Sequence, residues 1–79
     1  MLTGKKVKLS TVLRMNHPAV RVEISNQGAA PNVIPAGTEG TVLINATSEL
    51  LVEFYQPGSA HSDQVWIKRE FFGQFLDTL

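Results

Sequence analysis

Apolar and polar residues alternate with a period of two in the first third of the chain. One such segment surrounds Val7 and Leu9, and a second runs from Val20 to Ile24, where Arg21 and Glu23 separate the apolar positions. A period of two places alternate side chains on opposite faces of an extended strand. Both segments are therefore expected to be half-buried strands.

Three further strands are expected in the second half of the chain, around residues 42–44, 50–54 and 65–67. A long uncharged loop at residues 26–35 precedes them, and a loop at residues 56–63 separates the last two. Arg69 to Phe72 is too short for a stable isolated helix, so we expect a single helical or 3₁₀ turn there. Residues 73–79 are a candidate for the segment that closes the sheet. The expected core consists of Val7, Leu9, Val22, Ile24, Val42, Ile44, Val52, Phe54, Val65, Ile67 and Phe72.

Two glycines three positions apart mark the entry to the third strand. Pro35 restricts φ just upstream, and Gly37 and Gly40 suit a turn, a bend or a bulge because they lack a Cβ atom. The following residues lead into a strand and not into a helix, which argues against a phosphate-binding loop. We expect these three residues to shape the backbone and not to contact a ligand.

The length indicates a single domain spanning residues 1–79. A chain of this size buries only about 60% of its unfolded surface, and self-association would bury more. The chain has no cysteine, which indicates a reducing compartment, and no stretch has the apolar length of a signal peptide core or a membrane span. A soluble cytoplasmic protein is expected.

Positive and negative charges are balanced in number but separated along the chain. The formal net charge is zero, yet every charge before residue 23 is positive and every charge from Glu23 to Asp63 is negative. The basic end could pair with the acidic middle within the fold, or the basic face of one molecule could meet the acidic face of another. Without an excess of positive charge, nucleic-acid binding is not expected.

No residue pattern predicts a catalytic or metal site. His17 and His61 are the only histidines, and they do not have the spacing of metal ligands. Ser59, Ser62 and Asp63 flank His61, but residues so close together in a loop rarely reach the geometry of a nucleophile and its base. We therefore expect no catalytic residue, no metal and no cofactor.

Aromatic residues give the strongest functional signal. If Glu53 faces water, alternation places Leu51 and Tyr55 on the same outward face, and Gln64 and Lys68 do the same for Trp66. A symmetric hairpin then sets Tyr55 opposite Gln64, Glu53 opposite Trp66 and Leu51 opposite Lys68. Tyr55 and Trp66 become diagonal neighbours. The predicted binding residues are Leu51, Tyr55, Gln64, Trp66 and Lys68, in an exposed interface or, alternatively, partly covered by the loop at residues 26–35.

Four segments together resemble the SH3-like small barrels. They are Gly4 to Leu9, Gly37 to Val42, Leu51 to Phe54, and Val65 to Ile67 with Glu70-Phe71 behind it. The superfamily includes KOW-type domains, the barrel of the nitrile hydratase β subunit and the type II dihydrofolate reductases. The resemblance implies an all-β barrel of five to six strands with a short helical or 3₁₀ turn near Arg69–Phe72.

The resemblance leaves more than one function open. The first is a non-catalytic binding or assembly module that joins a protein partner or a second copy through the aromatic face. The second is an oligomeric enzyme like the type II dihydrofolate reductases, whose Val-Gln-Ile-Tyr strand lines a pore that binds a nicotinamide cofactor. Gln64 matches the glutamine of that motif, whereas Asp63, Val65 and Trp66 replace its other residues. The third is KOW-like contact with RNA or the ribosome.

Overall fold

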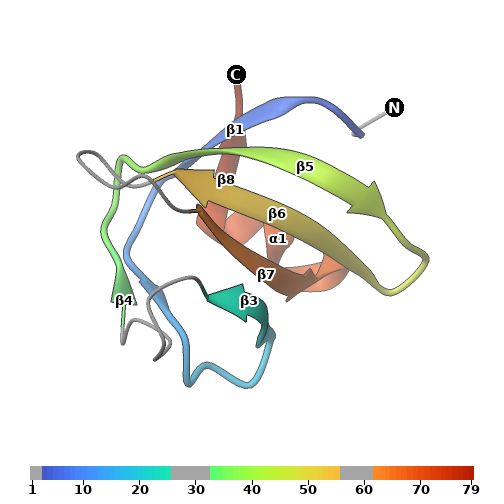
Figure 1. The fold of residues 1–79 in the computed structure, drawn as a ribbon, viewed down its shortest axis with the longest axis horizontal. Helices are drawn as coiled ribbons and strands as arrows, with labels where there is room; N and C mark the ends of the chain where they lie inside the picture. The colour runs from blue at the N-terminus through green and yellow to red at the C-terminus, as the bar shows by residue number, and fades with distance from the viewer. Residues whose placement is uncertain (1–2, 26–32, 56–61) are drawn as a thin grey trace.

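The computed structural model of the chain describes residues 3–25, 33–55 and 62–79, with backbone only for residues 24 and 25 (Figure 1). Its strands are β1 (Lys6–Leu9), β2 (Leu13–Arg14), β3 (Val20–Ser25), β4 (Val33–Ile34), β5 (Glu39–Asn45), β6 (Glu49–Tyr55), β7 (Ser62–Lys68) and β8 (Leu76–Thr78), and its helix is α1 (Arg69–Phe75). The prediction of an all-β chain with a short helix after the fifth expected strand is confirmed.

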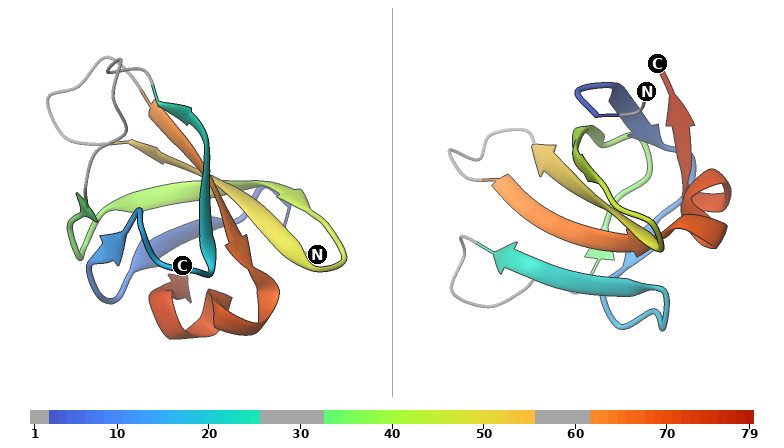
Figure 2. Two further views of the ribbon diagram at one scale, coloured as in Figure 1. Left: turned by 90° about the horizontal axis from the view of Figure 1, so that it is seen from below. Right: turned by 90° about the vertical axis from the view of Figure 1, so that its right-hand side faces the viewer.

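Six strands form one antiparallel sheet in the order β3-β7-β6-β5-β1-β8, and β2 pairs with β4 in a small second sheet. The predicted closing segment contains β8, which pairs with β1. Figure 2 shows that the large sheet twists strongly, so that β3 crosses β1 and β5 at a wide angle. Such twist lets the two sheets and α1 enclose a core in a short chain.

The core lies on one face of the large sheet. Most of the predicted core is confirmed, because alternate residues of β1, β5, β6 and β7 are fully or almost fully buried. The α1 helix packs against β6 and β7 and inserts Phe72 into this core. The core residues are Val7, Leu9, Leu13, Val20, Ile34, Val42, Leu50, Val52, Phe54, Val65, Ile67, Phe72 and Leu76.

The helix is longer than the single turn expected from the sequence. It spans the seven residues of α1, and its first residue is fixed to the turn between β5 and β6. The amide of Arg69 donates to the carbonyl of Ser48, and its side chain bonds to the carbonyl of Thr47. These tertiary contacts, with the burial of Phe72, stabilise a helix too short to form in isolation.

Two of the predicted core positions lie outside the core, and a bulge in the β5–β6 ladder explains the first, Ile44. Val42 pairs with Val52, but Ile44 pairs with Leu51, so the intervening Leu43 reverses the strand's phase. Ile44 consequently lies on the opposite face and is 45% exposed. Val22 is half-buried on edge strand β3, which also has a register shift beyond it, and the side chain of Ile24 lies outside the described part of the chain.

Gly37 and Gly40 both serve the backbone, but in different ways. Gly37 has a φ of 89° in the turn before β5, where its amide donates to the carbonyl of Leu9. Pro35 begins the same turn and accepts a hydrogen bond from the hydroxyl of Thr38 at 2.7 Å. Gly40 lies within β5, where a Cβ atom would be 2.6 Å from the carbonyl oxygen of Glu53. The expected turn is thus confirmed at Gly37, while Gly40 permits the close approach of β5 to β6.

The close approach at Gly40 predicts that two glycine-to-alanine substitutions change the free energy of unfolding in opposite directions. Gly40→Ala is expected to lower the free energy of unfolding by about 1–3 kcal/mol, because the added methyl group overpacks against β6. Gly73→Ala is the control: its Cβ atom meets open space in α1, so stability is expected to rise by about 0.5–1 kcal/mol. Urea denaturation measures both. Equal effects from the two variants would contradict the close approach.

The bulge at Leu43 predicts which apolar residues of neighbouring strands matter for stability. Phe54→Ala is expected to cost about 3–5 kcal/mol because it empties a fully buried ring site. Ile44→Ala is expected to change the free energy of unfolding by no more than about 0.5 kcal/mol, as for other surface substitutions. Denaturation is measured at a concentration where the chain is monomeric, and a loss of several kcal/mol for Ile44→Ala would then place this residue back in the core.

Candidate functional site

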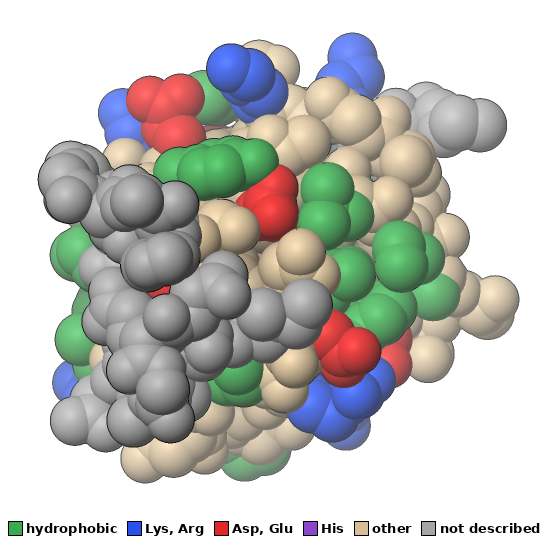
Figure 3. All heavy atoms as spheres, viewed as in Figure 1, with side chains coloured by type: hydrophobic (Ala, Val, Ile, Leu, Met, Phe, Trp, Pro, Cys, Tyr) green, Lys and Arg blue, Asp and Glu red, His purple; other side chains and the backbone are tan. Residues whose placement is uncertain are grey.

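The candidate site is the face of the large sheet that points away from the core, which we call the outer face. Figure 1 looks onto this face, with α1 behind it. Figure 3, from the same side, shows hydrophobic side chains gathered over β5 and β6 with acidic and basic side chains next to them. The largest exposed apolar side chains of this face are Ile44 and Tyr55, which are 45% and 56% exposed.

Four residues form a row across the outer face. Ile44 pairs with Leu51, Leu51 with Trp66, and Trp66 with Arg21, from β5 through β6 and β7 to β3. Leu51 has the predicted orientation, but the expectation that it is exposed is wrong, since it is 5% exposed and lies outside the core cluster. Its two cross-strand neighbours flank it, so the row has a small apolar centre of its own.

Trp66 is half-buried and makes two polar contacts. The guanidinium carbon of Arg21 lies 5.3 Å from the centroid of the indole ring, within cation–π range. The indole Nε1 donates to Glu23 Oε2 at 3.1 Å. Residues of β3 thus cover part of the ring, whereas most of the loop that was the alternative cover, residues 26–32, lies outside the described residues.

The predicted diagonal contact between Tyr55 and Trp66 is wrong. Tyr55 pairs with Ser62, Glu53 with Gln64, and Glu49 with Lys68. The ladder therefore runs two residues further toward the loop than expected, and the residues between β6 and β7 are 56–61 and not 56–63. A shift of two keeps every side chain on its predicted face but separates the two rings along the strands.

A hydrogen-bonded cluster centred on the carboxylate of Glu53 lies beside Tyr55, where the second ring was expected. The hydroxyl of Tyr55 donates to Glu53 Oε1, and Glu53 Oε2 accepts from Ser62 Oγ at 3.0 Å and from Gln64 Nε2 at 3.3 Å. The bond from Tyr55 is the largest cause that lowers the pKa of Glu53, and the same bond raises the pKa of Tyr55. Sequence reasoning used Glu53 only as a marker of the outward phase.

The ion pairs of the described residues centre on Arg21. Its guanidinium lies 2.8 Å from Glu49 Oε1 and 3.6 Å from Glu23 Oε2. Of the alternatives left open by the sequence, pairing of the basic part with the acidic part within the fold is the one seen for this residue. Lys68, although opposite Glu49 in register, is exposed and makes no ion pair with the described residues.

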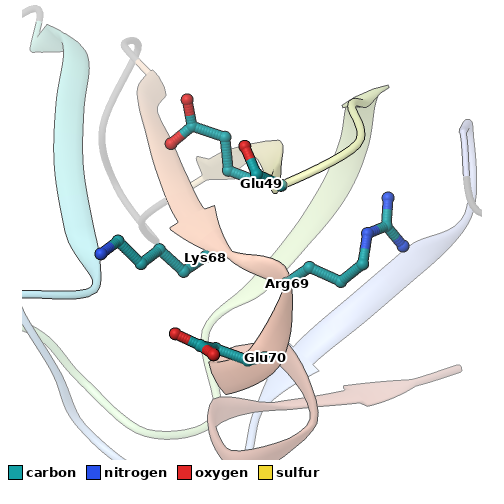
Figure 4. A pocket seen from close by; sticks show the side chains of 5 residues that line it. Glu49, Lys68, Arg69 and Glu70 are labelled. Atoms are coloured by element: carbon teal, nitrogen blue, oxygen red, sulfur yellow. The ribbon is translucent and has the colours of Figure 1, made fainter.

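An open groove lies where β6, β7 and α1 meet, lined by Ser48, Glu49, Lys68, Arg69 and Glu70 (Figure 4). The figure shows Lys68 and Arg69 pointing to opposite sides. Besides Thr47, the Arg69 guanidinium bonds to Asn45 Oδ1 and the carbonyl of Ala46, so it holds the β5–β6 turn against α1. The charges of the groove do not converge on one point.

The histidine of the described residues has a packing role. The ring of His17 makes edge contacts with Phe71 and Phe75 of α1, at centroid distances of 5.6 and 5.2 Å, and its Nδ1 accepts from the amide of Ala19. Within residues 3–25, 33–55 and 62–79, no three His, Cys, Asp or Glu side chains gather as a metal site would require. Ser59 and His61 lie outside these ranges.

Comparison of the chain with protein-family models, curated proteins and solved structures gives no match. Among the described residues, no helix has the length and apolarity needed to cross a membrane. The site must therefore be interpreted from its own geometry.

The Glu53–Tyr55 bond predicts a coupled titration. Since the fold depresses the pKa of Glu53 below its ordinary value of 4.5, ionised Glu53 adds to stability above that pH, and the contribution is lost as pH falls through the depressed pKa. Tyr55 is the only tyrosine, so absorbance at high pH reports it alone. We expect its pKa to lie above 10.0 and to return toward that value in Glu53→Gln.

The control for this titration is Glu49→Gln, which removes the same charge from the same strand. Glu49 bonds to Arg21 and not to the tyrosine hydroxyl, so this variant should leave the pKa of Tyr55 close to that of the parent. Equal shifts in the two variants would show that overall charge, and not the hydrogen bond, sets the tyrosine pKa.

Proposed function

We propose that the chain is a non-catalytic binding module that joins another protein through its outer face. The observation that carries the proposal is Ile44, a large aliphatic side chain left 45% exposed by the bulge. Ile44 on β5 is paired with Leu51 on β6, which is paired in turn with Trp66 on β7. The carboxylates of Glu49 and Glu53 lie on β6, on either side of Leu51. An apolar centre with a polar rim is the usual anatomy of a protein interface.

An SH3-like barrel is our proposal for the fold type. The strongly twisted antiparallel sheet and the helix that covers one end of the core support it (Figure 2). The absence of cysteine supports the cytoplasm as the location.

The two alternative functions have less support from the geometry. In a reductase of the type II class, Gln64 and Trp66 would face the ligand, but Gln64 bonds to Glu53 and Arg21 covers part of the Trp66 ring. In an RNA-binding domain the outer face would meet phosphates, which Glu49 and Glu53 would repel. A protein partner suits a face that combines apolar side chains with charges of both signs.

Site-specific photocrosslinking tests the proposed function. Benzoylphenylalanine replaces Ile44 on the outer face and, as the control, Gln74, an exposed residue of α1 on the other side of the sheet. The full chain is irradiated in the cells that produce it. We expect a protein adduct from position 44 and little or none from position 74, because only the outer face binds a partner.

Circular dichroism first establishes that both crosslinker variants keep the parent's β spectrum. Identical adducts from the two positions, or no adduct from position 44, would overturn the proposal that the outer face is the binding surface. The adduct's mass also shows whether the partner is a second copy or another protein.

A further inference from the structure

We propose that the occupant of the outer face is a second copy of this chain, with the two-fold axis parallel to β5 and between the two outer faces, and with Lys6 of each copy paired with Glu53 of the other. This inference rests on the proposed function, because it names the partner of the same face. Three observations carry it: a carboxylate and an ammonium group that lie in the same cross-strand row and form no ion pair with the residues that the structure describes, and an exposed aliphatic side chain on the strand between them.

The carboxylate is Glu53. Its two oxygens accept hydrogen bonds from Tyr55, Ser62 and Gln64, all of which are neutral donors. These bonds fix the position of the carboxylate and favour its ionised form. Glu53 forms no ion pair within the part of the chain that the structure describes, in contrast to Glu23 and Glu49, which share Arg21. It therefore presents an oriented negative charge on the outer face.

The ammonium group is that of Lys6 on β1. Lys6 pairs with Thr41, and Thr41 pairs with Glu53, so the three side chains form one row on the outer face. Lys6 is exposed and makes no ion pair within residues 3–25, 33–55 and 62–79. Its neighbour Lys8 also makes no ion pair among the described residues, but it lies opposite two acidic residues, Glu39 on β5 and Asp77 on β8. Lys6 is the cation of β1 on this face without an acidic residue opposite it.

A two-fold axis parallel to β5 brings these two groups together. β1 and β6 are the two neighbours of β5 in the sheet, so in a face-to-face pair β1 of one copy lies over β6 of the other. Rotation about this axis leaves each residue's position along the strand direction unchanged. Lys6 of one copy therefore lies over Glu53 of the other, and the symmetry produces two equivalent pairs. Ile44 lies on β5 itself and meets the second copy's Ile44 near the axis.

The net charge also permits this pairing. The formal charge of zero leaves little overall repulsion between copies, although each face carries separated charges of both signs. A partner of opposite charge would be drawn either to the lysines or to the carboxylates, whereas a second copy complements both at once. Association also buries surface that so small a chain leaves exposed.

A charge-exchange experiment tests the pairing by light scattering at low salt. The parent is expected to reach twice the 8.7 kDa mass of one chain. Lys6→Glu and Glu53→Lys should each weaken self-association by about tenfold or more, since every pair becomes two like charges. An equimolar mixture of the two variants should restore a heterodimer, because each pair then joins opposite charges. Lys8→Glu, the matched control on β1, should weaken association less.

Several results would overturn the inference. They are a parent that stays at 8.7 kDa up to millimolar concentration, a mixture that does not associate, or equal effects of Lys6→Glu and Lys8→Glu. If Glu53→Lys disturbs the fold by circular dichroism, Glu53→Gln replaces it and should give a smaller loss of association. A monomeric parent that still crosslinks another protein from position 44 would refute the second copy but retain the proposed function.

Discussion

The structure depends on the pairing of β6 with β5 on one side and β7 on the other. Gly40 allows the backbones of β5 and β6 to approach closely, and this ladder sets Val52 and Phe54 in the core. The same ladder contains the bulge at Leu43, which turns Ile44 away from the core. One set of strand pairings therefore builds the hydrophobic core and, on its reverse side, the exposed apolar residue on which the proposed function rests.

The sequence predicted the fold well because a period of two is a local property. It requires only that one face of each strand be buried. Leu50, Val52 and Phe54 alternate with outward-facing residues, and all three are buried in the structure. Even the helix after β7 was expected, although not its full length, since its stability comes from contacts of Arg69 and Phe72 with distant segments. Local pattern and tertiary packing agree over most of the chain.

The candidate site was harder to predict because register and bulges are non-local. Alternation assigned Tyr55 and Trp66 to the correct face but could not reveal that Tyr55 pairs with Ser62. A slip of two residues leaves the burial pattern unchanged, so no apolar position in the sequence signals it. A bulge, in contrast, reverses which face of the sheet the following side chains point to. The sequence pattern assigns Ile44 to the core, but the bulge before it turns its side chain to the outer face, where it is exposed.

The side chains of the outer face differ in how much binding free energy they can still contribute to a partner. Trp66 is partly covered by Arg21 and bonded to Glu23, so its ring is already stabilised within the chain and gains less from a partner than a free ring would. Ile44 is 45% exposed, and Glu53 has hydrogen bonds but no ion pair among the described residues. The binding free energy available to this face is thus expected to come from β5 and β6 and not from the tryptophan. The sequence alone favours the largest aromatic residue, whereas the structure favours the side chains whose interactions are still incomplete.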